Sequence, residues 1–303
     1  MMITDSVKEE WLKILDEKEK LFSGSKLMRF INQPQKYFNS IWVRKISFPL
    51  SKKGTEKTCK TFWGDSFTVV LPAGNDIYLA GTKSFFAEIR QAKFMIKQLK
   101  QGETYMDVGA HFGFFSLLAS RLVGDEGKIF SFEPTRSTFA VLTKNLLKQK
   151  NSFLLSLAVS STEGEVEFFE FNQFLSENNS AKPDENKVTA KDMQRYMVKT
   201  ISLSKFCANE KITPSIIKID AEGLELEVVS GMKKLLELHS PKIIMEFARE
   251  KNENYFSAAE ILKSFGYKSF LIDKNGNKEA SNDLTKNLKE MNAESDNVVF
   301  MKN

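Results

Sequence analysis

Four acidic residues in this 303-residue sequence follow short apolar runs, and their side chains are the ones most able to do chemistry. Asp107, Glu133, Asp220 and Glu246 each stand at or just after the carboxyl end of a stretch with the character of a buried strand. In an open α/β sheet, the carboxyl ends of parallel strands converge on one crevice, where ligands bind. Because buried carboxylates are costly unless they bind something, the four acids predict a ligand site at these strand ends.

A glycine turn separates the first acid from a segment with helical spacing. Gly109 and Gly113 would let a ligand approach bare backbone beside the N-terminus of the following helix. The dinucleotide fingerprint requires glycine at its first, third and sixth positions, but His111 and Phe114 occupy the third and sixth here. The turn is therefore typical of nucleotide-binding folds in general and does not match the NAD-type pattern.

The acids on either side of this turn suit one kind of ligand. Asp107 lies two residues before the first glycine, where a carboxylate can serve an ammonium group. Glu133, roughly 20 residues further on, is placed to accept hydrogen bonds from ribose hydroxyls. An ammonium group at one end and an adenosine at the other describe S-adenosylmethionine, whereas the alternative is a structural turn with two solvated acids. The residues predicted to bind this cofactor are Asp107, Gly109, Ala110, His111, Gly113, Glu133 and Asp220.

Two blocks of the sequence resemble the signature segments of the FkbM-type methyltransferases. They are DVGAHFGFFS at residues 107–116 and IKIDAEGLELEVVSGM at residues 217–232, and residues 157–169 and 198–206 resemble the family's connecting segments. The resemblance implies a Rossmann-like class I methyltransferase sheet, mostly parallel with an antiparallel last strand. It also implies S-adenosylmethionine as the methyl donor and O-methylation of a hydroxyl on a sugar or other small molecule.

Methyl transfer to a hydroxyl benefits from a base. Asp220, Glu222 and Glu246 are the catalytic candidates, although a helix N-terminus also welcomes an acid at position 222. His111 stands where the family usually has Asn, and we favour a role in filling a turn position with unusual backbone angles. Lys218 is expected to point from the opposite face of its strand. Because the sequence lacks the His spacing of metal sites, we predict no metal.

Composition and charge argue against several classes of function. The formal net charge is +5 at pH 7, and because the sequence has no arginine-rich arm, we do not expect a nucleic-acid partner. No run approaches the ~20 apolar residues that a membrane span requires. Without a signal-peptide pattern at the N-terminus, a cytoplasmic location is expected. Cys59 and Cys207 fit no metal or redox spacing.

The elements that must position the site alternate between strands and helices from residue 84 onward, which predicts a mostly parallel sheet covered on both faces. Residues 84–303 are the expected S-adenosylmethionine-binding domain, and residues 1–83 an N-terminal extension of helices and an antiparallel cap. Strands are expected at residues 104–108, 127–132, 153–159, 215–219, 241–245, 267–272 and 297–301.

In the N-terminal extension, a capping box predicts a helix over residues 6–22, whose apolar stripe packs on the main domain or on a second subunit, so a homo-oligomer is possible. Residues 41–50, 58–71 and 77–80 have a β-like pattern. Phe62, Trp63 and Phe67 line a substrate pocket or fill the core, and we favour the core. Residues 172–195 form either a binding loop or a disordered stretch without function.

Two other functions share these features. One is an NAD-type oxidoreductase on a related sheet, and the other is a non-catalytic nucleotide-binding module that kept the fold.

Overall fold

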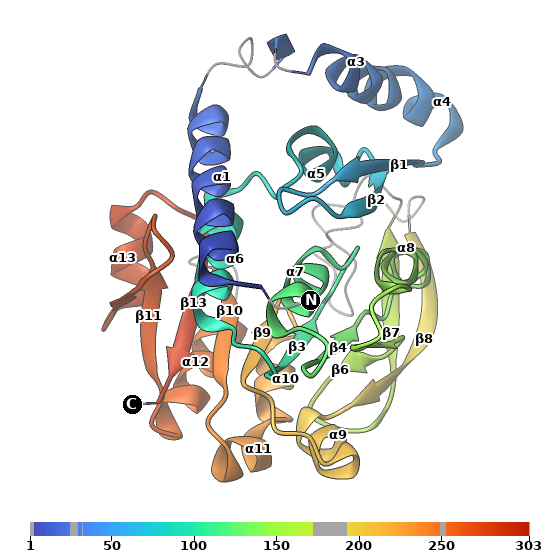
Figure 1. The fold of residues 1–303 in the computed structure, drawn as a ribbon. Coiled ribbons are helices and arrows are strands. Elements are labelled where there is room, and N and C mark those ends of the chain that lie inside the picture. The colour runs from blue at the N-terminus through green and yellow to red at the C-terminus, as the bar shows by residue number, and fades with distance from the viewer. Residues whose placement is uncertain (1–2, 25–29, 32, 172–192, 249–252, 303) are drawn as a thin grey trace.

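The computed structural model describes residues 3–24, 30–31, 33–171, 193–248 and 253–302. Its centre is an eight-stranded sheet with the strand order β12-β11-β13-β10-β9-β3-β4-β5 (Figure 1). These strands are β3 (Thr104–Val108), β4 (Lys128–Phe132), β5 (Ser152–Leu155), β9 (Ile216–Ile219), β10 (Lys242–Ala248), β11 (Lys268–Ile272), β12 (Lys278–Ala280) and β13 (Ser295–Met301).

The sheet is parallel at its centre and antiparallel at one side. β3 pairs in parallel with β4 and β9, β4 with β5, and β9 with β10. β13 runs antiparallel to both β10 and β11. The predicted mostly parallel sheet with an antiparallel last strand is therefore confirmed.

Helices cover both faces of this sheet, which explains why its central strands are continuous apolar runs. One apolar core lies between the sheet and α6 (Phe86–Gln98), α7 (Phe114–Val123) and α8 (Arg136–Leu146). The other core lies under the helices on the opposite face, α9 (Leu203–Glu210), α10 (Glu225–Ser230), α11 (Lys233–Leu238), α12 (Glu253–Ser264) and α13 (Leu284–Glu290).

The N-terminal helix α1 (Asp5–Ser23) packs against α6, and it confirms the helix predicted over residues 6–22. Trp11 and Leu15 are buried in the first core. The ammonium group of Lys93, on α6, pairs with Asp16 at 2.7 Å and with Glu19 at 2.5 Å. Apolar contact and buried charge therefore both hold α1 on the main domain.

Two of the β-like stretches predicted in the N-terminal extension are helical. α3 (Pro34–Trp42) continues into a π-helix, η1 (Val43–Ser47), and α4 (Phe48–Ser51), so the strand predicted over residues 41–50 was wrong. Its apolar residues recur every three to four positions, which is a helical period. Residues 77–80 belong to α5 (Asn75–Ala80) and are also helical.

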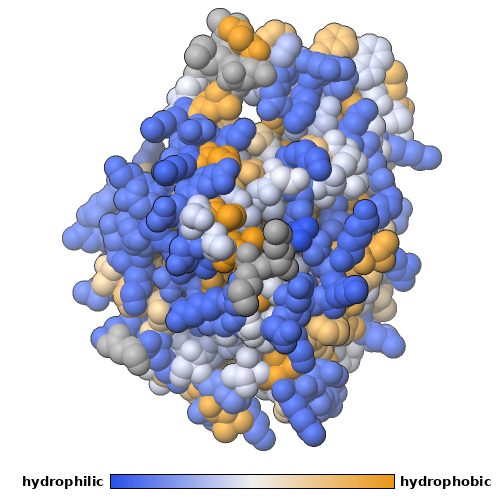
Figure 2. Space-filling view, viewed as in Figure 1, coloured by the Kyte–Doolittle hydropathy of each residue, from blue (hydrophilic) through white to orange (hydrophobic). Residues whose placement is uncertain are grey.

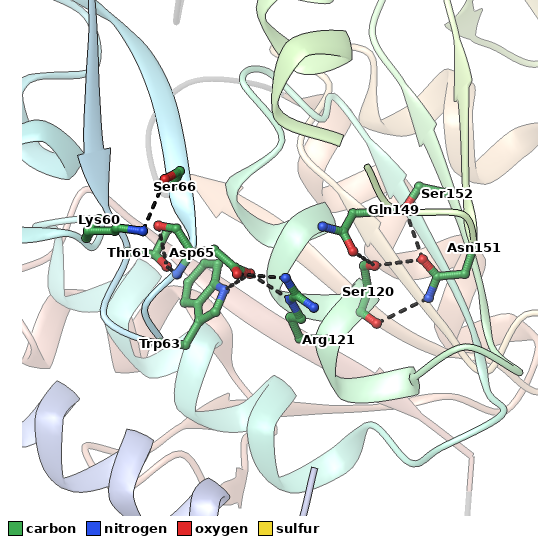
Figure 3. Close-up of polar contacts among 10 residues, drawn as sticks. All are labelled: Lys60, Thr61, Trp63, Asp65, Ser66, Ser120, Arg121, Gln149, Asn151 and Ser152. Atoms are coloured by element: carbon green, nitrogen blue, oxygen red, sulfur yellow. Dashed lines mark hydrogen bonds and ion pairs between the residues drawn. The ribbon is translucent and has the colours of Figure 1, made fainter. Parts of the chain in front are cut away.

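The third stretch, residues 58–71, forms a hairpin of β1 (Thr55–Lys60) and β2 (Ser66–Leu71), as the predicted hairpin extension requires. In the turn, Asp65 accepts hydrogen bonds from Trp63 Nε1 and from Arg121 of α7, each at 2.7 Å (Figure 3). Phe62 and Phe67 are buried and lie against Phe114, which confirms core filling.

Residues 153–159 divide between two sheets. β5 belongs to the main sheet, whereas β6 (Ala158–Val159) joins β7 (Gly164–Phe171) and β8 (Met193–Ile201) in a three-stranded sheet. The single strand predicted there was wrong, because a break at residues 156–157 redirects the chain. Most of the polar stretch predicted over residues 172–195 lies outside the described residues.

Candidate active site

The two sequence blocks meet at the carboxyl ends of β3 and β9. The amide groups of Gly109 and Ala110 both donate to Phe132 O at 3.0 Å, and Asp220 N donates to Val108 O at 3.1 Å. Gly109 has a φ of 75°, and a Cβ atom there would lie 1.8 Å from Asp220 O. Only glycine fits at this crossing, so the geometry fixes both loops against each other.

Glu133 lies directly over the glycine turn. Its carboxylate accepts hydrogen bonds from His111 N and from Thr135 N, each at 2.9 Å. Burial raises the pKa of Glu133 to about 7, although these two hydrogen bonds oppose the shift. The carboxyl group stands at the mouth of the turn, where backbone amides and not a cation of the described residues contact its oxygens.

His111 has the left-handed φ of 50° that the turn requires, as expected from the residue type at this position. Its backbone amide is the group that contacts Glu133. Burial, followed by the charges of Lys83 and Lys218, lowers the pKa of the His111 imidazole well below its usual value. The imidazole is therefore neutral at physiological pH.

Lys218 on β9 is directed toward the site, which corrects the expectation that it points away. Side chains alternate along a strand, so Lys218 shares a face with Asp220. Its ammonium group lies 3.3 Å from Asp107 Oδ1, 3.2 Å from Asp220 Oδ2 and 3.2 Å from Gly109 O. Burial alone would lower the pKa of Lys218, but the two carboxylates outweigh it and raise the pKa above its usual value.

Asp107 is enclosed behind the cleft. Ser116 of α7 donates to Asp107 Oδ2 at 2.6 Å, and Lys218 supplies the cation on its other side. Burial raises the pKa of Asp107, and the charge of Lys218 opposes this effect. The carboxylate that was predicted to serve a ligand's ammonium group thus contacts an ammonium group of the chain itself.

A cleft opens at the strand ends between the N-terminus of α6, the glycine turn and the three-stranded sheet. The cleft holds about 230 Å³ of enclosed space and opens to solvent at its mouth. The predicted site residues in its wall are Gly109, His111, Glu133, Asp220, Glu222 and Glu246. Those outside the wall are Asp107, Ala110 and Gly113.

Three carboxylates lie near the ends of β9 and β10, and two of them, Asp220 and Glu246, are in the cleft wall, whereas Glu225 of α10 lies behind it. Burial, followed by the nearby charge of Asp220, raises the pKa of Glu246 to about 7. Glu225 is fully buried and accepts hydrogen bonds from Ala221 N at 3.0 Å and Gly223 N at 3.3 Å, so it holds the turn that carries Glu222. The side chain of Asp220 is 38% exposed and is the most open of the three.

Two further residues belong to the site. Glu88 of α6 lies in the cleft wall, and burial raises its pKa. It pairs with Lys83 at 3.0 Å. No signal in the sequence identifies Lys83, because it lies between α5 and α6 and belongs to no motif. The two-residue alternation of side chains along β9 could have shown that Lys218 faces the same side as Asp220.

The polar groups of the wall fit the proposed cofactor. Glu88 Oε2 is buried there without a hydrogen-bond partner among the described residues. Such a group favours a ligand with its own donors and acceptors. Within the described ranges, no cluster of three or more His, Cys, Asp or Glu side chains could hold a metal ion. Over the same residues, no helix is long and apolar enough to cross a membrane.

Comparison with known proteins identifies relatives for these loops. The family model described as the methyltransferase FkbM domain matches residues 107–270, just over half of the chain. Hexuronic acid methyltransferase AglP of Haloferax volcanii is 26% identical over 147 residues, which span 48% of this chain and 56% of that protein. The matched segment therefore extends over only about half of this relative.

Solved structures with a similar fold include two methyltransferases. Methyltransferase FkbM of Methylobacillus flagellatus superimposes with a TM-score of 0.41 and 13% identity, covering 76% of this chain and 52% of that chain. Precorrin-6y C5,15-methyltransferase of Geobacter metallireducens gives a TM-score of 0.40 and 15% identity, covering 73% of this chain and 90% of that chain.

Proposed function

This chain belongs to the FkbM methyltransferase family, and we propose that it transfers the methyl group of S-adenosylmethionine to a hydroxyl of a sugar or another small molecule. The observation that carries the proposal is the arrangement of Glu133, Asp220 and Glu246 around one cleft, beside a glycine turn whose backbone faces that cleft. Carboxylates at three strand ends are costly unless a ligand uses them.

The donor side of the cleft is formed by the glycine turn and Glu133. We assign the ribose hydroxyls to Glu133, whose carboxylate faces the cleft, and the neighbouring backbone to Gly109 and His111. The ammonium group of the donor falls to Asp220, because Asp107 is enclosed. Asp107, with Ala110 and Gly113, then acts by holding the turn and Lys218 in place.

The acceptor side is formed by Glu246, Glu222 and the exposed edge of Asp220. S-Adenosylmethionine supplies an electrophilic methyl group on a sulfonium. The acceptor oxygen gains that methyl group and loses its proton, which Glu246 takes up. A carboxyl group with a pKa of about 7 suits this role, because a large part of it is ionised at neutral pH and the ionised form is more basic than an ordinary carboxylate. Alignment of the reactants can supply roughly 7–11 kcal/mol, and a base a further 10²–10⁴ in rate.

A sugar acceptor is supported by the relative from Haloferax volcanii, whose name describes a hexuronic acid methyltransferase. A uronic acid offers both hydroxyl and carboxyl oxygens as acceptors, so the experiment has to separate a methyl ether from a methyl ester.

The test is methyl transfer from labelled S-adenosylmethionine to a panel of neutral sugars and uronic acids. We expect a labelled product that survives mild alkali, since ethers resist the hydrolysis that cleaves esters. A labelled product destroyed by alkali would overturn O-methylation of a hydroxyl. Binding of S-adenosylhomocysteine without transfer to any hydroxyl would favour the non-catalytic module.

Glu246→Gln provides the matching variant test. We expect kcat to fall by 10²–10⁴ and S-adenosylhomocysteine affinity to stay within a few-fold. In the wild-type enzyme, kcat/KM should rise with pH toward a plateau above about 7, because the base must lose its proton first. Glu260→Gln, on the exposed side of α12, is the control and should leave both quantities unchanged.

A further inference from the structure

The helical segment from α3 to α4 presents a row of large apolar side chains to solvent. The outer residues recur three to four positions apart, as one side of a helix does. They are Phe38 at 66% exposure, Ile41 at 51%, Trp42 at 51%, Ile46 at 41% and Leu50 at 83%. We call these five residues the 38–50 face. Side chains of this size are seldom left in solvent as a contiguous row without a partner.

The inner side of the same segment is fixed to the rest of the protein. Val43 and Phe48 are buried. Asn39 Nδ2 donates to the Tyr78 hydroxyl of α5 at 3.3 Å, and Ser40 bonds to Asn75 at the start of α5. The helix is therefore already packed on one side, and the 38–50 face has no further part of the domain to cover it among the described residues.

The π-helix keeps this row straight. An α-helix has 3.6 residues per turn, so residues spaced by four drift sideways along it. Ile46 lies four residues beyond Trp42, and Leu50 four beyond Ile46. The wider turn of η1 (Val43–Ser47), with its i→i+5 pattern, reduces that drift. The local geometry thus favours one continuous apolar face.

The charges of this segment are all of one sign. Residues 33–53 contain five Lys or Arg residues and no Asp or Glu, which gives these 21 positions a formal charge of +5. Basic side chains therefore accompany the 38–50 face without an acidic residue among them. The five basic residues are Lys36, Arg44, Lys45, Lys52 and Lys53.

We propose that the 38–50 face docks on an anionic phospholipid surface. A helix that carries Trp, Phe and Leu on one side and Lys and Arg beside them lies in the plane of a membrane interface, with its apolar side chains at the acyl boundary. The basic residues are attracted to the negative surface of anionic lipid, and this attraction weakens with salt. In Figure 2, several hydrophobic side chains lie at the surface among hydrophilic ones at this end of the molecule.

The docked helix lies close to the cleft. Asp76 of α5, the helix on which α3 packs, accepts a hydrogen bond from Ser84 N at 3.2 Å. The adjoining residues Lys83 and Phe85 line the cleft, and Phe85 is itself 68% exposed. The upper end of the molecule in Figure 1 carries α3, α4 and α5. Docking there holds the cleft near the lipid surface.

The experiment is flotation of the full chain with vesicles of phosphatidylcholine alone or of phosphatidylcholine with phosphatidylglycerol. We expect the protein to float with the anionic vesicles, at least tenfold more weakly in Trp42→Ser/Ile46→Ser and in Arg44→Glu/Lys45→Glu. Leu147→Ser and Leu238→Ser are controls, because these residues are 77% and 68% exposed on other elements, and they should bind as wild type does. Unchanged melting temperatures establish that the variants fold.

Trp42 provides a direct readout of depth. Vesicles with brominated acyl chains should quench part of the tryptophan fluorescence in wild type. Trp42→Phe should float normally but lose that quenching, since Trp11 is buried and Trp63 is packed against the core in the β1–β2 turn, away from the 38–50 face. The proposal is overturned if wild type does not float with anionic vesicles, or if the patch variants float as well as wild type. It is also overturned if sedimentation shows a dimer that Trp42→Ser/Ile46→Ser dissociates while no vesicle binds, because the face would then join two copies. None of these results depends on methyl transfer.

Discussion

Gly109 is the residue at which the two sequence blocks of the family meet. A Cβ atom there would overlap the carbonyl oxygen of Asp220, which belongs to the backbone and has little freedom to move. The sequence shows a glycine after a strand, but it does not show that a second loop crosses it. The contact therefore joins the turns of the two blocks at one point.

Gly109→Ala should destabilise the protein far more than the same substitution at a left-handed glycine that has free space around it. Gly102 has a similar φ of 77° but nothing within 4 Å of its Cβ position, so Gly102→Ala isolates the backbone strain. We expect a loss of about 1–2 kcal/mol for Gly102→Ala and more than about 4 kcal/mol for Gly109→Ala. Urea denaturation measures both, and equal losses would show that the two loops do not press together.

The ammonium group of Lys218 pairs with the carboxylates of both Asp107 and Asp220, so its positive charge offsets the repulsion between them. Lys218→Met leaves Asp107 buried without its cation, so we expect a loss of about 3–5 kcal/mol in the free energy of unfolding. Adding Asp107→Asn removes the uncompensated charge and should recover part of this loss. Lys263→Met breaks a half-exposed pair with Glu260 and serves as the control, with almost no change. A double variant no more stable than Lys218→Met would contradict this account.

Glu225 makes the stability of the fold depend on pH in a direction that can be predicted. Its pKa is raised by burial from 4.5 to about 7, so the folded state keeps a proton that the unfolded state loses. Its contribution to stability is therefore present below pH 4.5 and is lost as the pH rises toward 7. Glu225→Gln has no such loss, so its stability relative to wild type should increase over this window, by roughly 1.4 kcal/mol per unit of pKa shift. Denaturation at pH 5 and pH 8 tests this, and a difference that does not vary with pH would refute it.

At the scale of elements, the strands of the parallel sheet were predictable because each is a short apolar run that ends in an acid or a turn. The N-terminal extension was less predictable. The segment from α3 to α4 carries Ile, Trp and Val, which favour strands, and only its three-to-four-residue spacing indicates a helix. β12 and α13 were also missed, because the segment around Gly276 is polar and its elements are short.

The hairpin of β1 and β2 is joined to α7 by a polar contact whose strength can be measured. Arg121 binds Asp65 through two nitrogen atoms, each at 2.7 Å, and Asp65 is only 21% exposed (Figure 3). Asp65→Asn should therefore cost about 1–3 kcal/mol in unfolding free energy. Glu56, in the same hairpin, pairs with Lys144 of α8, but both side chains are about half exposed. Glu56→Gln should therefore cost less than about 1 kcal/mol in unfolding free energy. Equal losses of unfolding free energy in the two variants would mean that the two hydrogen bonds from Arg121 to Asp65 add no stability beyond an exposed ion pair.

At the scale of the whole molecule, the order of strands decides which acids meet. β10, β9, β3 and β4 are neighbours in the sheet, so their carboxyl ends bring Glu246, Asp220, Asp107 and Glu133 to one edge. The sequence predicted this convergence from the alternation of strands and helices alone. It did not predict that Asp107 would be enclosed, because that depends on Lys218 and Ser116 reaching it from a neighbouring strand and from α7.

Equilibrium binding of S-adenosylhomocysteine, set beside binding of NAD, tests the central claim most directly. Isothermal calorimetry should give binding heat with S-adenosylhomocysteine and none with NAD. Glu133→Ala should weaken that binding at least tenfold, because the ribose hydroxyls lose their acceptor, whereas Glu163→Ala, in an exposed pair with Lys205, should not. Heat with NAD alone, or equal affinity in Glu133→Ala and wild type, would contradict the assignment of this cleft to the methyl donor.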